Sequence, residues 1–121
     1  MNVQLQDQIA LVTGAAGAIG ESICAALASN GAKVVYSDID SKKASDLAAT
    51  TPGAMSLRMD VTDEAEIESA MDRIIDVHGR IDILVNNAGI NTMAHRVNID
   101  QFPTAEWDRI LRVDLTGLFL V

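Results

Sequence analysis

Residues 8–20 read Gln-Ile-Ala-Leu-Val-Thr-Gly-Ala-Ala-Gly-Ala-Ile-Gly, and this stretch decides the fold class. Residues 8–13 are a short apolar run that ends at a glycine, which is typical of a strand buried on both faces of a parallel sheet. The residues after it begin a helical pattern near Ala18, with an apolar stripe of Ile19, Ile23, Ala26 and Leu27. The stretch therefore predicts a strand, a glycine-rich turn and a helix in direct succession.

A glycine-rich turn between a strand and a helix is suited to hold a pyrophosphate. Without side chains the backbone can turn tightly and approach the phosphates, while the start of the helix presents unpaired N–H groups and the positive end of its dipole. A tight turn with no ligand is the alternative, but the position directly after the first strand favours phosphate binding. The predicted pyrophosphate-binding residues are Gly14, Ala16, Gly17, Ala18, Ile19 and Gly20.

Strand and helix patterns alternate along the rest of the sequence. Apolar and β-branched runs predict strands over residues 33–37, 54–59 and 81–85. We expect the second helix to be capped by Asp40 or Ser41, the third by Thr62 and the fourth, behind Pro103, by Thr104. Residues 86–101 form a long polar connection before that fourth helix.

This alternation requires a parallel sheet with helices on both faces. We predict one α/β domain over residues 1–121, a Rossmann-like doubly wound parallel sheet that is incomplete and has the strand order 3-2-1-4. The fourth strand would be an open edge. The fourth helix would carry an apolar side made of Trp107, Ile110, Leu111, Leu115 and Leu118. Because open edges and apolar patches favour association, we expect a homo-oligomer.

Asp38 stands at the end of the second predicted strand. An acidic residue about 20 residues after the glycine-rich turn accepts hydrogen bonds from the ribose hydroxyls of an adenosine. Its charge would repel a 2′-phosphate, and residues 39–41 contain no Lys or Arg, so the sequence favours NAD over NADP. The alternative is that Asp38 or Asp40 only caps the next helix.

The unusual residues of the sequence collect where predicted strands end. These are the turn from Gly14 to Gly20, Asp38, Asp60, and residues 86–89, which read Asn-Asn-Ala-Gly. Ligands of open parallel sheets bind outside the carboxyl ends of the strands. The sequence therefore predicts one binding site at this edge of the sheet.

Composition and charge exclude several other classes of function. The formal net charge is −8, so we expect neither nucleic acid nor an anionic membrane as a partner, because both require basic surfaces. No apolar run reaches membrane-spanning length, and no basic residue precedes Lys33 as a signal peptide would require, so we expect a cytoplasmic protein. The single cysteine, Cys24, lies in a helical apolar pattern and is expected to be buried; no metal site is expected.

These motifs together resemble the short-chain dehydrogenase/reductase superfamily. Residues 13–20 resemble its Thr-Gly-x-x-x-Gly-x-Gly fingerprint, and residues 86–89 match its Asn-Asn-Ala-Gly motif in full. The resemblance covers the whole chain and implies an NAD cofactor with its pyrophosphate on the Gly14–Gly20 turn. It implies the adenosine ribose at Asp38 beside Ile39, and the adenine at Asp60 and Val61. It also implies that Asn87, Ala88 and Gly89 lie along the path to the nicotinamide ribose, with Asn86 as a sheet-stabilising residue.

The sequence departs from the family pattern at two positions. The middle glycine of the fingerprint is Ala18, whose methyl group narrows the approach to the phosphates. Asp114 stands where the family usually has an asparagine that supports proton relay, so a catalytic role and a structural role both stay open. Because Asp114 falls within the apolar stripe of the fourth helix, we also expect its ionised carboxylate to cost free energy there unless it is paired or hydrogen-bonded.

The resemblance implies an NAD(H)-dependent oxidoreductase that acts on an alcohol/carbonyl pair of a small-molecule substrate. The family also uses a serine and a Tyr-x-x-x-Lys pair. The single tyrosine here is Tyr36, and the residue four positions later is Asp40. We therefore expect these 121 residues to be an N-terminal portion that is inactive alone. The alternative is a non-catalytic dinucleotide-binding module, while a P-loop nucleotidase is disfavoured because no Gly-Lys-Ser/Thr follows the glycines.

Overall fold

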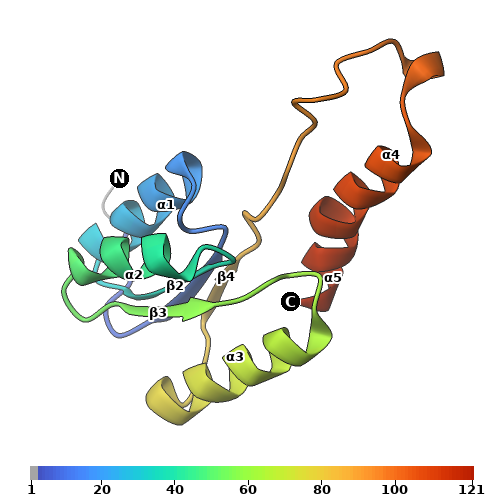
Figure 1. The fold of residues 1–121 in the computed structure, drawn as a ribbon. Helices are drawn as coiled ribbons and strands as arrows, with labels where there is room; N and C mark the ends of the chain where they lie inside the picture. Colours follow the sequence, from blue (N-terminus) through green and yellow to red (C-terminus); the bar gives the residue numbers. More distant parts are fainter. Residues whose placement is uncertain (1–2) are drawn as a thin grey trace.

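The apolar run at the start of the sequence forms strand β1 (Ile9–Thr13), and each of its residues is buried. This strand pairs in parallel with β2 (Lys33–Asp38) on one side and with β4 (Ile83–Val85) on the other, and β3 (Met55–Arg58) pairs with β2. The computed structural model describes residues 3–121, and the sheet in it has the order β3-β2-β1-β4 (Figure 1). The predicted strand order and fold class are confirmed.

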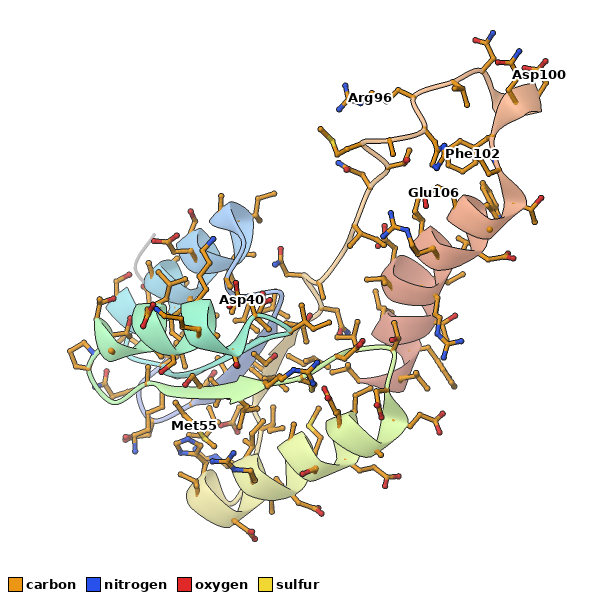
Figure 2. All side chains as sticks on the ribbon, in the orientation of Figure 1. Asp40, Met55, Arg96, Asp100, Phe102 and Glu106 are labelled. Atoms are coloured by element: carbon orange, nitrogen blue, oxygen red, sulfur yellow. The ribbon has the colours of Figure 1, made fainter. Side chains whose placement is uncertain are left out.

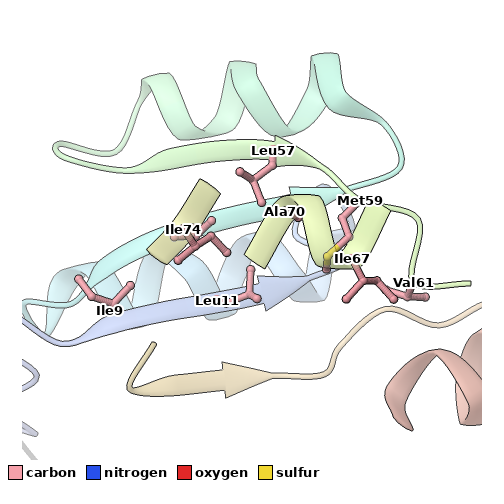
Figure 3. Close-up of a cluster of buried hydrophobic side chains, with 9 residues drawn as sticks. Ile9, Leu11, Leu57, Met59, Val61, Ile67, Ala70 and Ile74 are labelled. Carbon is pink, nitrogen blue, oxygen red and sulfur yellow. The ribbon is translucent and has the colours of Figure 1, made fainter. Parts of the chain in front are cut away.

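Helices cover both faces of this sheet. On one face α1 (Ala18–Ser29) and α2 (Ser41–Ala49) pack on alternate residues of β1 and β2, with Cys24 fully buried among them. On the other face α3 (Glu64–His78) packs Ile67 and Ile74 against Leu11 (Figure 3). Complete burial of an aliphatic side chain such as that of Leu11 contributes about 1.5–3 kcal/mol. Burial on both faces fixes β1 at the centre, so the residues that follow it are held rigidly.

Two predicted helix caps are wrong. The residue that caps α3 is Asp63, whose carboxylate accepts from the N–H of Glu66. Thr62 does not cap it, because the N–H and Oγ1 of Thr62 both donate to Oδ1 of Asp60. The helix α4 (Thr104–Leu111) begins after Pro103 without any side-chain cap, so Thr104 is its first residue.

The helical patterns near both ends of the chain also differ from expectation. In α1 the buried positions are Gly20 and Cys24, whereas Ile19 is 71% exposed, because it faces the open end of the sheet. The fourth helix is interrupted by a π-helical segment, η2 (Arg112–Gly117), before α5 (Leu118–Leu120). A π turn bonds i→i+5 and changes the direction of later side chains, so the predicted apolar side breaks up.

The C-terminal helices stand apart from the sheet in Figure 1, at the end of a long irregular connection that contains one 3-10 turn, η1 (Ile99–Gln101). The core contacts of this end of the chain come from Val113 in η2, Leu120 in α5 and the following Val121, which are half-buried. Trp107, Leu115 and Leu118 are exposed. Within residues 3–121, the helices are all too short or too polar to cross a membrane.

Candidate functional site

A cavity of about 660 Å³ lies at the carboxyl edge of the sheet, where β1, β2 and β4 end. Every residue predicted to bind the cofactor lines it: Gly14, Ala16, Gly17, Ala18, Ile19, Gly20, Asp38, Ile39, Asp60, Val61, Asn87, Ala88 and Gly89. The fold brings these residues together because parallel strands end at the same edge. Asp40, Lys43, Met59, Ile90 and Val113 also line the cavity and were not assigned to it from the sequence.

Two glycines of the turn are required by close packing. Gly14 has a φ of +62°, and a Cβ on it would lie 2.8 Å from the Cα of Ala88. A Cβ on Gly20 would lie 2.2 Å from the carbonyl oxygen of Gly14, so only glycine lets α1 approach the turn this closely. Gly17 is different, because its Cβ would meet only the oxygen of Gly14, at 3.4 Å. Position 17 therefore faces open space.

The start of α1 offers hydrogen-bond donors to the cavity. Its N-cap is Gly17, which has no side chain to accept from the first turn. The first intrahelical acceptor is the carbonyl of Gly17, which receives the N–H of Glu21 at 2.8 Å. The N–H groups before Glu21 have no acceptor within the helix, and the positive end of the helix dipole lies beside them. This end of the cavity suits an anion such as a pyrophosphate.

Asp38 connects the glycine-rich turn to the end of β2. Its Oδ2 accepts from the N–H of Ala16 at 2.9 Å, and its Oδ1 accepts from the N–H of Asp40 at 3.0 Å. The cap of α2 is Asp40, which accepts from the N–H of Lys43. The interpretation of Asp38 as a helix cap is therefore wrong. Its carboxylate instead fixes the turn and lies on the cavity wall.

Thr13 joins the end of β1 to the turn that follows β4. Its buried Oγ1 accepts from the N–H of Asn87 at 3.1 Å and from the N–H of Ala88 at 3.0 Å. In the opposite direction, Nδ2 of Asn87 donates to the carbonyls of Thr13 and Gly14, each at 3.1 Å. Asn87 thus makes the sheet-bridging bonds expected of Asn86, which is exposed.

Asp60 is held as a carboxylate on the far wall of the cavity. The N–H and hydroxyl of Thr62 both donate to its Oδ1, and these bonds keep the pKa of Asp60 below its ordinary value. Val61, next to it, packs against Gly117 of η2, where a Cβ would lie 2.7 Å from the Val61 Cγ2. The absence of a side chain at Gly117 therefore lets the C-terminal helices approach this wall.

Asp114 lies outside this cavity. It is exposed, so the expected cost of burying its carboxylate does not arise, and its Oδ1 accepts from the N–H of Ile90 at 2.8 Å. It lines an adjoining cavity of about 520 Å³ together with Gly89, Ile90, Asn91 and Arg109. Asp114 therefore ties η2 to the segment that leaves the first cavity.

A second contact holds the same segment from α4. Arg109 forms a two-bond ion pair with Glu106, in the first turn of α4 (Figure 2), and its Nη2 also donates to the carbonyl of Asn91. The Arg109 guanidinium lowers the pKa of Glu106 to about 2. Among residues 3–121 no group of His, Cys, Asp or Glu side chains is placed to hold a metal ion.

Comparison with known proteins yields one family. The family described as short chain dehydrogenase matches residues 8–121. An uncharacterized oxidoreductase of Bacillus subtilis, YxjF, is 42% identical over 120 residues, which are 96% of this chain and 46% of that protein. D-threitol dehydrogenase of Mycolicibacterium smegmatis is 37% identical over 122 residues, 98% of this chain and 46% of that protein.

Solved structures agree in fold. The crystal structure of 3-ketoacyl-(acyl-carrier-protein) reductase from Brucella melitensis complexed with NADH has a TM-score of 0.90 and 35% sequence identity. The match covers 97% of this chain and 48% of that one. The chain thus spans less than half the length of each of these relatives.

Proposed function

The chain belongs to the short-chain dehydrogenase family, and from this premise we propose that it supplies the dinucleotide-binding part of an NAD(H)-dependent oxidoreductase acting on an alcohol/carbonyl pair. The observation that carries the proposal is the single cavity lined by the glycine-rich turn, Asp38, Asp60 and residues 87–89. A bound nicotinamide dinucleotide would supply hydride transfer. The residues of this chain bind and orient it.

The pyrophosphate would lie on the Gly14–Gly20 turn. The start of α1 supplies N–H donors, and Gly17 leaves the space in front of them open. Ala18 replaces the middle glycine of the family fingerprint, but it is exposed at the start of α1, so its methyl group narrows this space without filling the turn. The backbone therefore fits the group in spite of the substitution.

The adenosine would lie between Asp38 and Asp60. With both oxygens of Asp38 already receiving backbone N–H groups, the carboxylate is fixed in position, and its remaining lone pairs can accept from ribose hydroxyls. A 2′-phosphate would meet this fixed negative charge, so we propose NAD as the preferred cofactor. Asp60 and Val61 would border the adenine.

The nicotinamide ribose would lie beside Asn87, Ala88 and Gly89. Thr13 holds this turn against β1, so its backbone keeps a constant position relative to the phosphate site. Asp114 would act on this end as a positioning residue, because it holds the N–H of Ile90 directly after the turn. Asp114 does not line the main cavity, so we propose no direct catalytic role for it.

We further propose that the 121-residue chain binds the dinucleotide without catalysing its turnover. Tyr36, its single tyrosine, is buried in β2 and bonds to the Thr51 hydroxyl at 2.9 Å. Burial also raises the pKa of Tyr36, which opposes a role in proton transfer. The isolated chain would then behave as the dinucleotide-binding module that the sequence left open as an alternative.

The test is binding and turnover measured on the same purified chain. NADH fluorescence titration should give saturable binding, and Asp38→Asn should weaken NADH by about tenfold or more, the worth of a charge-assisted bond, while weakening NADPH less. Asp46→Asn is the matched control, since Asp46 pairs with Lys42 on the exposed side of α2. Equal losses for NADH and NADPH would reduce Asp38 to a structural role. Steady NADH oxidation with small ketones, or steady NAD⁺ reduction with small alcohols, would refute the proposed inactivity.

A further inference from the structure

The adenosine end of the cavity contains a cation that the linear sequence did not place there. Residues 39–41 lack Lys and Arg, yet Lys43 lines the cavity beside Asp38, Ile39 and Asp40. Lys43 is the one basic side chain among the lining residues described, whereas Asp38, Asp40 and Asp60 are acidic. A ligand at this end of the cavity therefore lies near both a positive side chain and negative side chains.

The cap of α2 explains why Lys43 reaches the cavity. Asp40 accepts from the N–H of Lys43 at 3.0 Å, which fixes Lys43 one turn into the helix, directly behind the end of β2. The preceding residue, Lys42, is directed elsewhere, because its Nζ lies 2.6 Å from Oδ2 of Asp46 on the exposed side of α2. The two adjacent lysines thus differ in placement although they are chemically identical.

The partners of these side chains leave Lys43 available to a ligand. Both oxygens of Asp38 are engaged by the N–H groups of Ala16 and Asp40. Within residues 3–121, the ion pairs formed do not include Lys43, and its side chain is exposed. A lysine ammonium on a flexible stem can follow an anionic group over several ångströms, while the position of Asp38 is fixed.

We propose that Lys43 is a specificity-determining residue that interacts with an anionic group at the adenosine 2′ position. Asp38 disfavours a 2′-phosphate and Lys43 partly offsets this, so the site prefers NAD without being closed to NADP. A phosphate carries about −1.5 to −2 charges at neutral pH, so a single lysine attracts it much more strongly than it attracts an uncharged ribose hydroxyl. The inference rests on the proposed function, because it assumes that the cavity holds a dinucleotide.

The experiment compares Lys43→Gln with Lys42→Gln. Both variants lose one positive charge from the same turn of α2, and both keep the backbone N–H that the cap uses. Calorimetric titration with adenosine 5′-diphosphate and with its 2′-phosphorylated form probes the adenosine end alone. We expect Lys43→Gln to weaken the 2′-phosphorylated ligand about fivefold, between the values of an exposed ion pair and a charge-assisted bond, and the unphosphorylated one less than twofold.

Two further measurements sharpen the result. Lys42→Gln should leave both affinities within about twofold, because long-range effects of an exposed charge are screened. In an Asp38→Asn background the loss caused by Lys43→Gln should become larger, since the lysine then acts without the opposing carboxylate. Raising the salt concentration should reduce the Lys43 effect on the 2′-phosphorylated ligand.

The outcomes separate this inference from the proposed function. If the wild-type chain binds neither NADH nor adenosine 5′-diphosphate, both fail. If it binds them but Lys43→Gln behaves as Lys42→Gln does, only the role of Lys43 is overturned. Equal losses for the two ligands would assign Lys43 to the 5′-phosphates and would also overturn its role in specificity.

Discussion

Replacing Thr13 by valine removes one hydroxyl from a position that is 1% exposed and keeps the shape of the side chain. That hydroxyl accepts from the N–H groups of Asn87 and Ala88 and donates weakly, at 3.4 Å, to the carbonyl of Val85. The N–H of Asn87 also donates to the carbonyl of Val85 at 3.0 Å, so Thr13→Val leaves one backbone donor, the N–H of Ala88, without its acceptor at the base of the candidate site.

The expected cost follows from this one donor. A buried donor left unsatisfied costs about 1–3 kcal/mol. Ala88 is half-buried, so water recovers part of this, and we expect Thr13→Val to lower the free energy of unfolding by about 1–2 kcal/mol. The control is Thr13→Ser, which keeps the acceptor and loses one buried methyl group, worth about 1 kcal/mol.

Urea unfolding followed by circular dichroism measures both variants, and NADH titration under native conditions measures the site. We expect Thr13→Val to be the less stable of the two and to bind NADH more weakly, because the turn at residues 87–89 loses its bonds to the Thr13 hydroxyl and keeps only those made by the Asn87 side chain. If Thr13→Val is as stable as Thr13→Ser or more stable, the hydroxyl does not hold this turn and the reasoning is wrong.

Three further perturbations test other parts of the fold. Gly20→Ala should destabilise the chain by about 1–3 kcal/mol in thermal melts, because the new methyl group would lie 2.2 Å from the Gly14 oxygen; an unchanged melting temperature would contradict this close approach. The folded-state pKa of Asp60 is lowered, so the ionised carboxylate stabilises the fold above pH 3.8 and this stabilisation is lost as the pH falls further. The difference in unfolding free energy between wild type and Asp60→Asn should therefore narrow below pH 3.8. A difference that stays constant would argue against the Thr62 bonds as the cause of the lowered pKa. Exposed Leu118 and Phe119 should promote self-association, so replacing both with lysine should lower the mass found by light scattering at high concentration. A wild-type chain that is a clean monomer under these conditions would contradict this prediction.

The sheet and most of the candidate site could be predicted from the sequence because both depend on local patterns. The apolar run of β1, the glycines at 14 and 20, and Asp38 after β2 are separated by short stretches whose helix or strand character is readable from periodicity. Parallel strands then bring their ends to one edge, so the predicted residues meet in one cavity. Lys43 could have been included by noting that the third residue after a helix cap returns to the side of that cap.

The tertiary structure decided the contacts that join distant segments. Thr62 bonds to Asp60, so Asp63 caps α3 in its place, and Asn87 rather than the exposed Asn86 bonds to the end of β1. Asp114 left the expected apolar stripe because a π turn does not follow the period of 3.6 residues on which the stripe was predicted.

The sequence by itself therefore determined the four strands, their order in the sheet and the edge that holds the glycine-rich turn. Only the tertiary structure decided which side chains hold that turn and which charges face a ligand. The physical reason is that hydrophobic periodicity and glycine conformation act between neighbours in the chain. The bonds that the N–H groups of Ala16 and Ala88 donate to Asp38 and Thr13 instead depend on distances that exist only after the sheet has formed.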